Sequence, residues 1–275
     1  MHLYKAVWIV VILKHRLYFN FIKQVANACL KALRISAWQC IKMSWKGEVL
    51  LEENIGIIGA GRLGKSLARH FPREINVYIC DKDLDAAVYC AEKYNRISCK
   101  TDDIIEKLNY IFICVPPDEV KCFLEKYKER ISESSLVVNM ATSVDTKSLK
   151  SSFKNLEIIP LKPVAEAFAL LNGLKGVFIT DGDASGYTRR LSYIFKDLGE
   201  IITGNEMDVQ QVNRIATICA LNFYEKLEKE LSGQGVPEKI KDAAVKSVAT
   251  GTILGCPPDK DNYYIKGLMY KNKER

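Results

Sequence analysis

Three glycines of the stretch NIGIIGAGRLGKSLARHF, residues 54–71, follow the pattern G-x-G-x-x-G. Between a strand and a helix, the first glycine permits a tight turn, the second lets the backbone approach a pyrophosphate, and the third lets the helix pack closely. The free N–H groups that begin the helix then face the phosphates. The pattern predicts a dinucleotide site, and the alternative is a glycine turn kept only for packing. The residues of this predicted cofactor turn are Gly59, Ala60, Gly61, Arg62, Leu63 and Gly64.

An acidic residue follows the second predicted strand. Asp81 lies 20 residues after Gly61, where a carboxylate can accept hydrogen bonds from both ribose hydroxyls of NAD and repels the 2′-phosphate of NADP. The alternative is that Asp81 or Asp83 only caps the next helix. Lys82 and Arg62 could each reach a phosphate, so these residues favour NAD and leave NADP open.

A proline pair is expected to form the next wall of the cofactor cleft. Val115, Pro116 and Pro117 come at the end of the apolar run YIFICV. Proline has no backbone N–H to donate to a neighbouring strand, so the pair marks the carboxyl end of a strand. At that end of a parallel sheet the loops line the ligand crevice.

The elements that must position these residues alternate along the chain. Short β-branched runs and helical segments follow one another, which is the pattern of βαβ units and a parallel sheet. The strands are expected at Ile55–Gly59, Ile75–Cys80, Arg96–Cys99, Tyr110–Val115, Leu136–Asn139, Glu157–Pro160, Val177–Thr180 and Glu200–Thr203.

No further strand is predicted after residue 205. Two helical stretches follow, Glu206–Leu231 and Pro237–Leu254, separated by SGQGVP. The sequence therefore predicts an α/β protein. A Rossmann-type, mostly parallel sheet occupies residues 54–204, and a mainly helical substrate and dimerisation domain occupies residues 205–275.

Residues 1–53 read as a basic appendage in front of the glycine stretch. Residues 1–47 hold eight Lys/Arg and no Asp/Glu, which leaves 32 of the 40 basic residues against all 33 acidic ones elsewhere. An excess confined to one segment argues against a nucleic-acid partner. The longest apolar run, Ala6–Leu13, is too short to span a bilayer. The alternatives are a basic helix on an anionic membrane surface, a targeting peptide, or a spurious extension upstream of a start at Met43.

The cysteines and histidines offer no pattern suited to a metal. The nine Cys form no C-x-x-C pair, and the three His are His2, His15 and His70. Several cysteines stand in apolar runs, so we expect them to be reduced, buried and inert, in a cytoplasmic protein. The predicted site therefore holds no metal.

Four segments carry a resemblance to a known family. They are IGIIGAGRLGKSLARHF, YIFICVPPDEV, LVVNMATSVDTKSLKSSF and LEIIPLKPVAEA. In this order and spacing they resemble pyrroline-5-carboxylate reductase and its relatives, within the wider group that includes deazaflavin-dependent NADP reductases. The resemblance covers about residues 54–255. It implies hydride transfer from NAD(P)H to a small cyclic imine, in a dimer or larger assembly whose C-terminal helices interlock around the active site.

The chain departs from that family where the substrate would bind. Ile159-Pro160-Leu161-Lys162-Pro163 keeps the prolines of the family's Met-Pro-Asn-x-Pro turn but has Leu for Asn, and Lys162 is new. Residues 216–221, ATICAL, replace the Gly/Ser-rich turn that would hold a substrate carboxylate, and they continue a helix. Ser247 keeps a hydroxyl where the family has Gln-Thr. We therefore assign Lys162 and Ser247 as candidate catalytic groups, with a solvated loop lysine and an ordinary helix serine as the alternatives.

Other donors on the C-terminal helices are candidate substrate ligands, because imine reduction needs a proton donor near the nitrogen. These are Thr217, Asn222 and Thr250. The related β-hydroxyacid dehydrogenases would need Lys followed four residues later by Asn, and VQQVNRIATICALNF lacks that pair.

Three hypotheses remain from the sequence. The first is an NAD(P)-dependent reductase acting on a cyclic imine or related carbonyl compound. The second is a dinucleotide-binding regulatory or assembly protein that has lost the carboxylate turn. The third attaches either activity to a membrane through residues 1–47. A homodimer is expected in each case, because apolar residues surround most of the helix that begins at Glu206.

Overall fold

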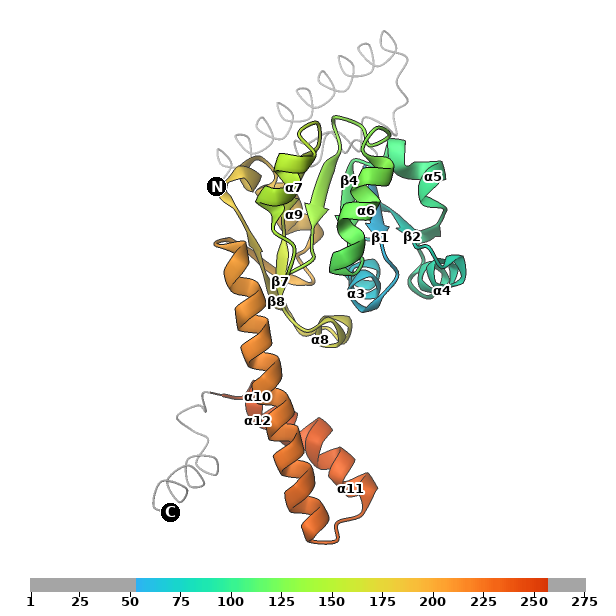
Figure 1. The fold of residues 1–275 in the computed structure, drawn as a ribbon. Coiled ribbons are helices and arrows are strands. Elements are labelled where there is room, and N and C mark those ends of the chain that lie inside the picture. Colours follow the sequence, from blue (N-terminus) through green and yellow to red (C-terminus); the bar gives the residue numbers. More distant parts are fainter. Residues whose placement is uncertain (1–52, 257–275) are drawn as a thin grey trace, which may run out of the picture.

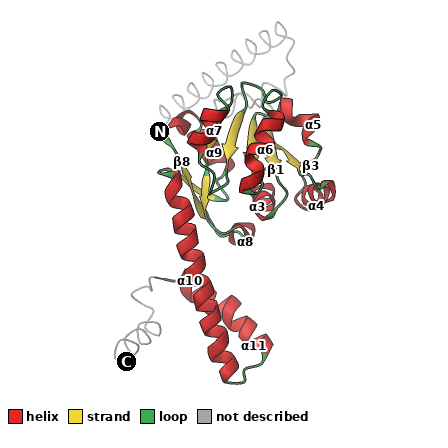
Figure 2. Ribbon diagram, in the orientation of Figure 1, coloured by secondary structure: helices red, strands yellow, loops and turns green. Residues whose placement is uncertain are grey.

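The computed structural model describes residues 53–256, and the predictions for residues 1–52 and 257–275 lie outside that range. A six-stranded, fully parallel sheet forms the centre of the molecule (Figures 1 and 2). Its strand order is β3-β2-β1-β4-β5-β6, the order of a Rossmann sheet, which confirms the predicted fold class. The strands are β1 (Asn54–Ile58), β2 (Asn76–Cys80), β3 (Ile97–Ser98), β4 (Tyr110–Ile113), β5 (Leu136–Asn139) and β6 (Glu157–Pro160).

Helices cover both faces of this sheet, which explains why its strands are continuous apolar runs. Alternate residues of β4 point to opposite faces: Phe112 belongs to one apolar core, and Ile111 and Ile113 belong to the other. The first core includes residues of α3 (Arg62–His70) and α4 (Leu84–Tyr94). The second includes residues of α5 (Thr101–Ile104), η1 (Ile105–Lys107), α6 (Pro117–Tyr127) and α7 (Thr146–Ser152).

A second sheet of three strands follows, in the order β7-β8-β9. Its elements are β7 (Lys162–Val164), α8 (Ala167–Leu171), β8 (Gly176–Thr180), η2 (Gly182–Gly186), α9 (Thr188–Ile194) and β9 (Gly199–Thr203). β7 was not predicted, because its three residues, KPV, include a proline and only Leu161 separates them from β6. β7 pairs antiparallel with β8, and β8 pairs parallel with β9.

Four phenylalanines join the two sheets into one core. Phe71 and Phe112, from the six-stranded part, pack edge-on or tilted against Phe195 at centroid distances of 5.3 and 5.6 Å. Phe178 of β8 packs on the same Phe195 at 4.7 Å. These rings are fully or almost fully buried. The second sheet therefore shares the first apolar core with α3 and the six-stranded sheet.

The chain then leaves the sheets as a pair of helices, here called the helical arm (residues 206–254). α10 (Glu206–Gly233) runs away from the sheets, and α11 (Glu238–Ala243), the π-helical segment η3 (Ala244–Ala249) and α12 (Thr250–Leu254) return beside its far half (Figure 1). The two predicted helices are thus present. Val209 is the only buried residue of α10. No helix within residues 53–256 combines the length and apolar character needed to cross a membrane.

Candidate functional site

The glycine turn between β1 and α3 has the geometry that its sequence predicts. Gly59 has a φ of +108°, and a Cβ there would lie 2.7 Å from the Cys114 carbonyl oxygen. A Cβ on Gly64 would collide with the Gly59 carbonyl, whereas one on Gly61 would meet nothing within 4 Å. Gly59 and Gly64 are therefore required by packing. Gly61 opens onto free space, as a residue that a ligand approaches would.

No side chain caps the start of α3. Gly61 is its N-cap residue, and its first turn contains no acidic residue. The unpaired N–H groups and the positive end of the helix dipole therefore face outward at the turn. An anionic group that arrives there is stabilised by both.

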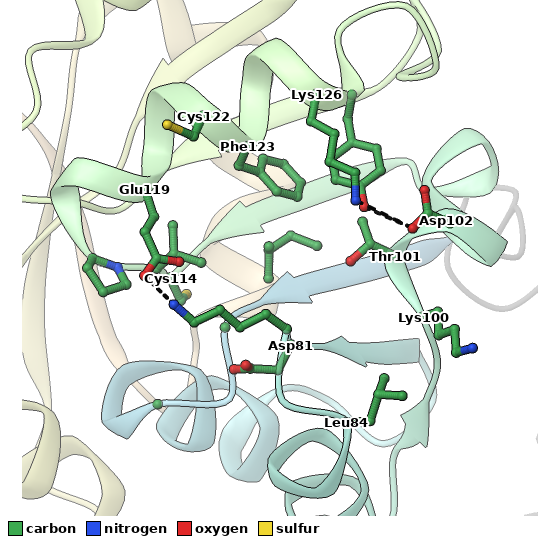
Figure 3. Close-up of a pocket in the computed structure, with 17 residues that line it drawn as sticks. Asp81, Leu84, Lys100, Thr101, Asp102, Cys114, Glu119, Cys122, Phe123 and Lys126 are labelled. Carbon is green, nitrogen blue, oxygen red and sulfur yellow. Dashed lines mark hydrogen bonds and ion pairs between the residues drawn. The ribbon is translucent and has the colours of Figure 1, made fainter.

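A cavity of about 660 Å³ adjoins this turn, within the size range of small-molecule sites. It lies between the ends of β1, β2 and β4, the start of α5 and one side of α6 (Figure 3). Six of the predicted cofactor residues line it: Gly59, Gly61, Asp81, Lys82, Val115 and Pro116. The predicted residues Ala60, Arg62, Leu63, Gly64 and Pro117 are not among its lining residues.

Asp81 is held across the glycine turn rather than capping a helix. Its Oδ2 accepts a hydrogen bond from Ala60 N at 2.6 Å, and its Oδ1 accepts one from Asp83 N at 2.9 Å. Asp83 is the cap of α4, since its Oδ1 accepts from Asp85 N and Ala86 N. Each Asp81 oxygen keeps a further lone pair, so the carboxylate can accept hydrogen bonds from a ligand in the cavity.

A surface ion pair joins two sides of the cavity. Lys82 Nζ donates to Glu119 Oε1 at 2.6 Å, linking the end of β2 to α6 (Figure 3). This hydrogen bond raises the pKa of Lys82. An anion that used Lys82 would have to compete with Glu119. Arg62, the other predicted phosphate contact, pairs with Glu166 at 3.5 Å, and both side chains are exposed.

The outer wall of the cavity was missed by sequence reasoning. Leu84 and Phe123 supply apolar surface on opposite sides (Figure 3). Glu119, Phe123 and Tyr127 follow one another at four-residue spacing along α6, and that helical spacing was the signal that could have found them. The remaining unpredicted lining residues are Ile58, Lys100, Thr101, Asp102, Cys114, Cys122 and Lys126.

Lys162 is buried, so the alternative of a solvated loop lysine is wrong. Lys162 does not line the cavity, and its catalytic role stays a prediction. Its ammonium donates to the carbonyls of Ala141 at 2.7 Å and Val144 at 2.9 Å. It also pairs with Glu206 Oε2 at 3.3 Å. Burial lowers the pKa of Lys162 to about 8, although Glu206 opposes that shift.

The same ammonium belongs to a cluster of four side chains, here called the polar cluster: Asn139, Thr146, Lys162 and Glu206. The Glu206 carboxylate accepts from Thr146 N at 2.9 Å and from Thr146 Oγ1 at 2.7 Å. Asn139 Nδ2 donates to Thr146 Oγ1 at 2.9 Å. Since Asn139 ends β5 and Glu206 begins α10, the cluster fixes the loop after β5 to the base of the helical arm.

The other candidate catalytic and substrate residues lie on the helical arm, and none lines the cavity. Ser247 is exposed on the π-helical segment, and Thr250 Oγ1 donates to Val245 O at 2.9 Å. Thr217 and Asn222 are exposed on α10. Figure 1 shows the outer part of this arm away from the sheets. A single chain therefore does not bring these residues to the cavity, and their roles stay predictions.

The described residues contain no group of three or more His, Cys, Asp or Glu that could hold a metal ion.

The cysteines are less uniformly buried than predicted. Cys80 and Cys90 are buried, but Cys122, Cys219 and Cys256 are exposed.

Comparison with known proteins supports the fold. Residues 54–143 match the family described as NADP oxidoreductase coenzyme F420-dependent. The structure of Plasmodium falciparum pyrroline carboxylate reductase with NADP bound matches with a TM-score of 0.61 at 16% identity, covering 76% of this chain and 80% of that one. No curated protein matches the chain.

Two further solved structures give the same result. Pyrroline-5-carboxylate reductase from Coxiella burnetii matches with a TM-score of 0.59 at 16% identity, over 82% of this chain and 93% of that one. A putative oxidoreductase from Mycobacterium avium 104 matches with a TM-score of 0.58 at 14% identity, over 79% and 84%. At such identities the likeness shows a shared fold.

Proposed function

We propose that this chain is an NAD(P)-dependent reductase that acts on a C–N or C–O bond of a small cyclic imine or related carbonyl compound. The observation that carries the proposal is the joint placement of the glycine turn and Asp81 on one cavity, beside an uncapped helix start. The cavity lies where β1 and β4 are neighbours, which is the point at which strand order reverses. Ligands of open α/β sheets bind at this point.

The residues present fit a nicotinamide dinucleotide. The N–H groups at the start of α3 would bind the pyrophosphate, and Gly61 leaves room for it. Asp81 would accept hydrogen bonds from the adenosine ribose, and Leu84 and Phe123 would contact the adenine. The cofactor, when bound, supplies the hydride. The chain supplies orientation and a surface that excludes water.

NAD is the favoured cofactor in this proposal. Asp81 is held by Ala60 N and Asp83 N in a position to meet ribose hydroxyls, and its charge disfavours a 2′-phosphate. Lys82 is the group that could accept NADP, but it is engaged by Glu119. The Plasmodium falciparum enzyme was solved with NADP, so the choice rests on these local contacts and not on the relatives.

We further propose that the helical arm forms a homodimer. Its exposed apolar side chains include, on α10, Met207, Val212, Ile215, Ile218, Leu221, Phe223 and Tyr224 and, on the returning helices, Ile240, Val248, Ile253 and Leu254. Such a surface marks an interaction site. A second copy could then bring Ser247, Thr217, Asn222 or Thr250 to the substrate. Size measurement by light scattering tests this, and a monomer at micromolar concentration would contradict it.

One observation favours the regulatory alternative. α10 runs unbroken through residues 216–221, so the arm offers no turn of N–H groups for a substrate carboxylate. A dinucleotide-binding protein without turnover would have this feature. A reductase whose substrate lacks a carboxylate would have it too.

Turnover assays separate the two functions. Full-length protein is mixed with NADH or NADPH and a panel of pyrroline-5-carboxylate, small imines without a carboxylate, and keto acids, and loss of absorbance at the nicotinamide band is followed. The reductase proposal expects oxidation of the cofactor with at least one imine or carbonyl compound. Tight cofactor binding with no turnover across the panel would support the regulatory alternative.

A further inference from the structure

Two cysteines face each other at the edge of the candidate cofactor cavity. β2 and β3 pair in parallel through Tyr78 with Ile97 and Ile79 with Ser98, so the next pair in register is Cys80 and Cys99. Their sulfur atoms lie 3.5 Å apart, in hydrogen-bond contact. Residues in register on neighbouring strands are separated by about 5 Å, which is a backbone spacing that a disulfide can bridge.

The surroundings of the two thiols differ in a way that suits stepwise oxidation. Cys80 is fully buried, whereas Cys99 is partly exposed. The hydrogen bond from Cys80 lowers the pKa of the Cys99 thiol, while the same contact and then burial raise that of Cys80. Cys99 is thus the thiol that an oxidant reaches first and that ionises more readily. Within residues 53–256 no other two cysteine sulfurs are in hydrogen-bond contact.

Both cysteines are joined directly to residues of the cavity. Asp81 follows Cys80, and Lys100 and Thr101 follow Cys99, and all three line the cavity. A disulfide would reduce the sulfur separation from 3.5 Å to about 2.05 Å. The backbone spacing already suits the bond, so the two side chains close this gap by turning about their Cα–Cβ bonds, and the cross-link ties the end of β2 to the end of β3. Asp81 follows the cross-linked Cys80, so any adjustment of that backbone would shift it relative to Ala60 N, its partner at 2.6 Å.

We propose that Cys80 and Cys99 form a reversible disulfide that weakens dinucleotide binding in the adjoining cavity. The effect on binding rests on the proposed function, but the cross-link itself does not. Two cysteines that the sequence predicts to be inert would then make dinucleotide binding depend on whether an oxidant is present.

The oxidant is a hydroperoxide. The Cys99 thiolate attacks the outer peroxide oxygen, the O–O bond breaks, and the alkoxide leaves and takes up a proton. Cys99 is now a sulfenic acid. The Cys80 sulfur attacks it, the S–S bond forms, and hydroxide leaves and becomes water with the Cys80 proton. Both sulfurs are oxidised by one electron each and the peroxide is reduced by two. A dithiol reverses the reaction by exchange.

The test uses the full chain, reduced or treated with hydrogen peroxide. Peptide mapping by mass spectrometry looks for a link between the peptides that contain residues 80 and 99, and NADH binding is titrated before oxidation, after it, and after dithiothreitol. We expect the linked peptide, a Kd for NADH raised by about tenfold, the scale of one charge-assisted hydrogen bond, and recovery on reduction.

Three variants make the result specific. Cys99→Ser and Cys80→Ala should bind NADH when reduced and keep that affinity after peroxide, whereas Cys256→Ser should still lose it. Cys256 is the matched control because it is an exposed thiol that does not line the cavity. Absence of the linked peptide, or its formation with unchanged NADH affinity, would overturn the proposal. Reduced protein that binds neither NADH nor NADPH would overturn the proposed function and the effect on binding, while mapping still decides the cross-link.

Discussion

The sheet region buries most of its large apolar side chains, whereas the helical arm leaves most of its own exposed. In residues 54–203 the aliphatic side chains of β1, β4, β5 and β6 are buried within the same chain. In α10 only Val209 is buried, while Ile215, Ile218 and Leu221 are each 45–56% exposed. One chain is therefore enough to build the cofactor cavity. The arm holds Ser247 and the proposed substrate ligands. In a single chain its apolar surface is exposed to solvent, as the surface of an interaction site is.

The polar cluster connects the two regions, and breaking it should have the largest effect on stability. Lys162→Met leaves the Glu206 carboxylate, whose side chain is 10% exposed, without its cation. We expect a loss of about 3 kcal/mol in the free energy of unfolding. Urea denaturation checks this. The double variant Lys162→Met/Glu206→Leu should recover part of the loss, and an equal or greater loss in the double variant would contradict the role given to the pair.

Lys162 should also give stability a pH dependence. Its pKa is about 8 in the folded protein against 10.5 ordinarily, so the unfolded chain holds the proton between those values and the folded chain does not. Stability contributed by this group therefore rises as pH increases from 8 to 10.5, by up to about 3 kcal/mol. The measurement is the difference in unfolding free energy between wild type and Lys162→Met across this range. A difference that stays constant or shrinks would contradict the pKa assignment.

Gly61→Asp tests the cofactor region alone. A Cβ at this position meets no atom within 4 Å, so we expect folding to be preserved, while the carboxylate occupies the place proposed for the pyrophosphate. NADH affinity should fall by at least about 100-fold, as expected when a charge-assisted anion contact is replaced by repulsion. Gly182→Asp is the matched control, because Gly182 also has nothing within 4 Å. Equal affinity of the two variants would place the dinucleotide elsewhere.

Ile218→Asp/Leu221→Asp tests the arm alone. Two carboxylates on the exposed apolar surface should convert the proposed dimer to monomer. We expect about a tenfold loss or more in kcat/KM with NADH binding retained, because the cavity belongs to one chain. Lys226→Asp, an exposed position of the same helix, should leave the mass in light scattering unchanged. Loss of NADH binding in the double variant would show that the two regions are not separable.

The smallest effect is expected at the rim of the cavity. Glu119→Gln removes the charge that engages Lys82 across 2.6 Å. The freed ammonium can then meet a 2′-phosphate, so the ratio of NADPH to NADH affinity should rise by about threefold, the scale of an exposed ion pair. Parallel titrations of the two cofactors give the ratio. A fall in the ratio would mean that Lys82 does not face the 2′ position.

The parts of the fold that depend on local pattern could be predicted from the sequence. Strands such as Leu136–Asn139 and the turn at Gly59 follow from apolar runs and glycine chemistry, which act over a few residues. β7 could not be predicted, because Pro163 argues against a strand and only its pairing with Phe178 makes one. The burial of Lys162 could not be predicted from the sequence either. It depends on carbonyls at Ala141 and Val144 and on Glu206, which are distant in sequence.

Equilibrium titration of the full-length, reduced chain with NADH and NADPH, by calorimetry or cofactor fluorescence, tests the central claim most directly. The cavity beside the glycine turn predicts saturable binding at one site per chain, with NADH tighter than NADPH because of Asp81. The same titration with Gly61→Asp should show NADH affinity weaker by at least about 100-fold. Absence of binding of either cofactor to the folded wild-type chain would contradict the claim.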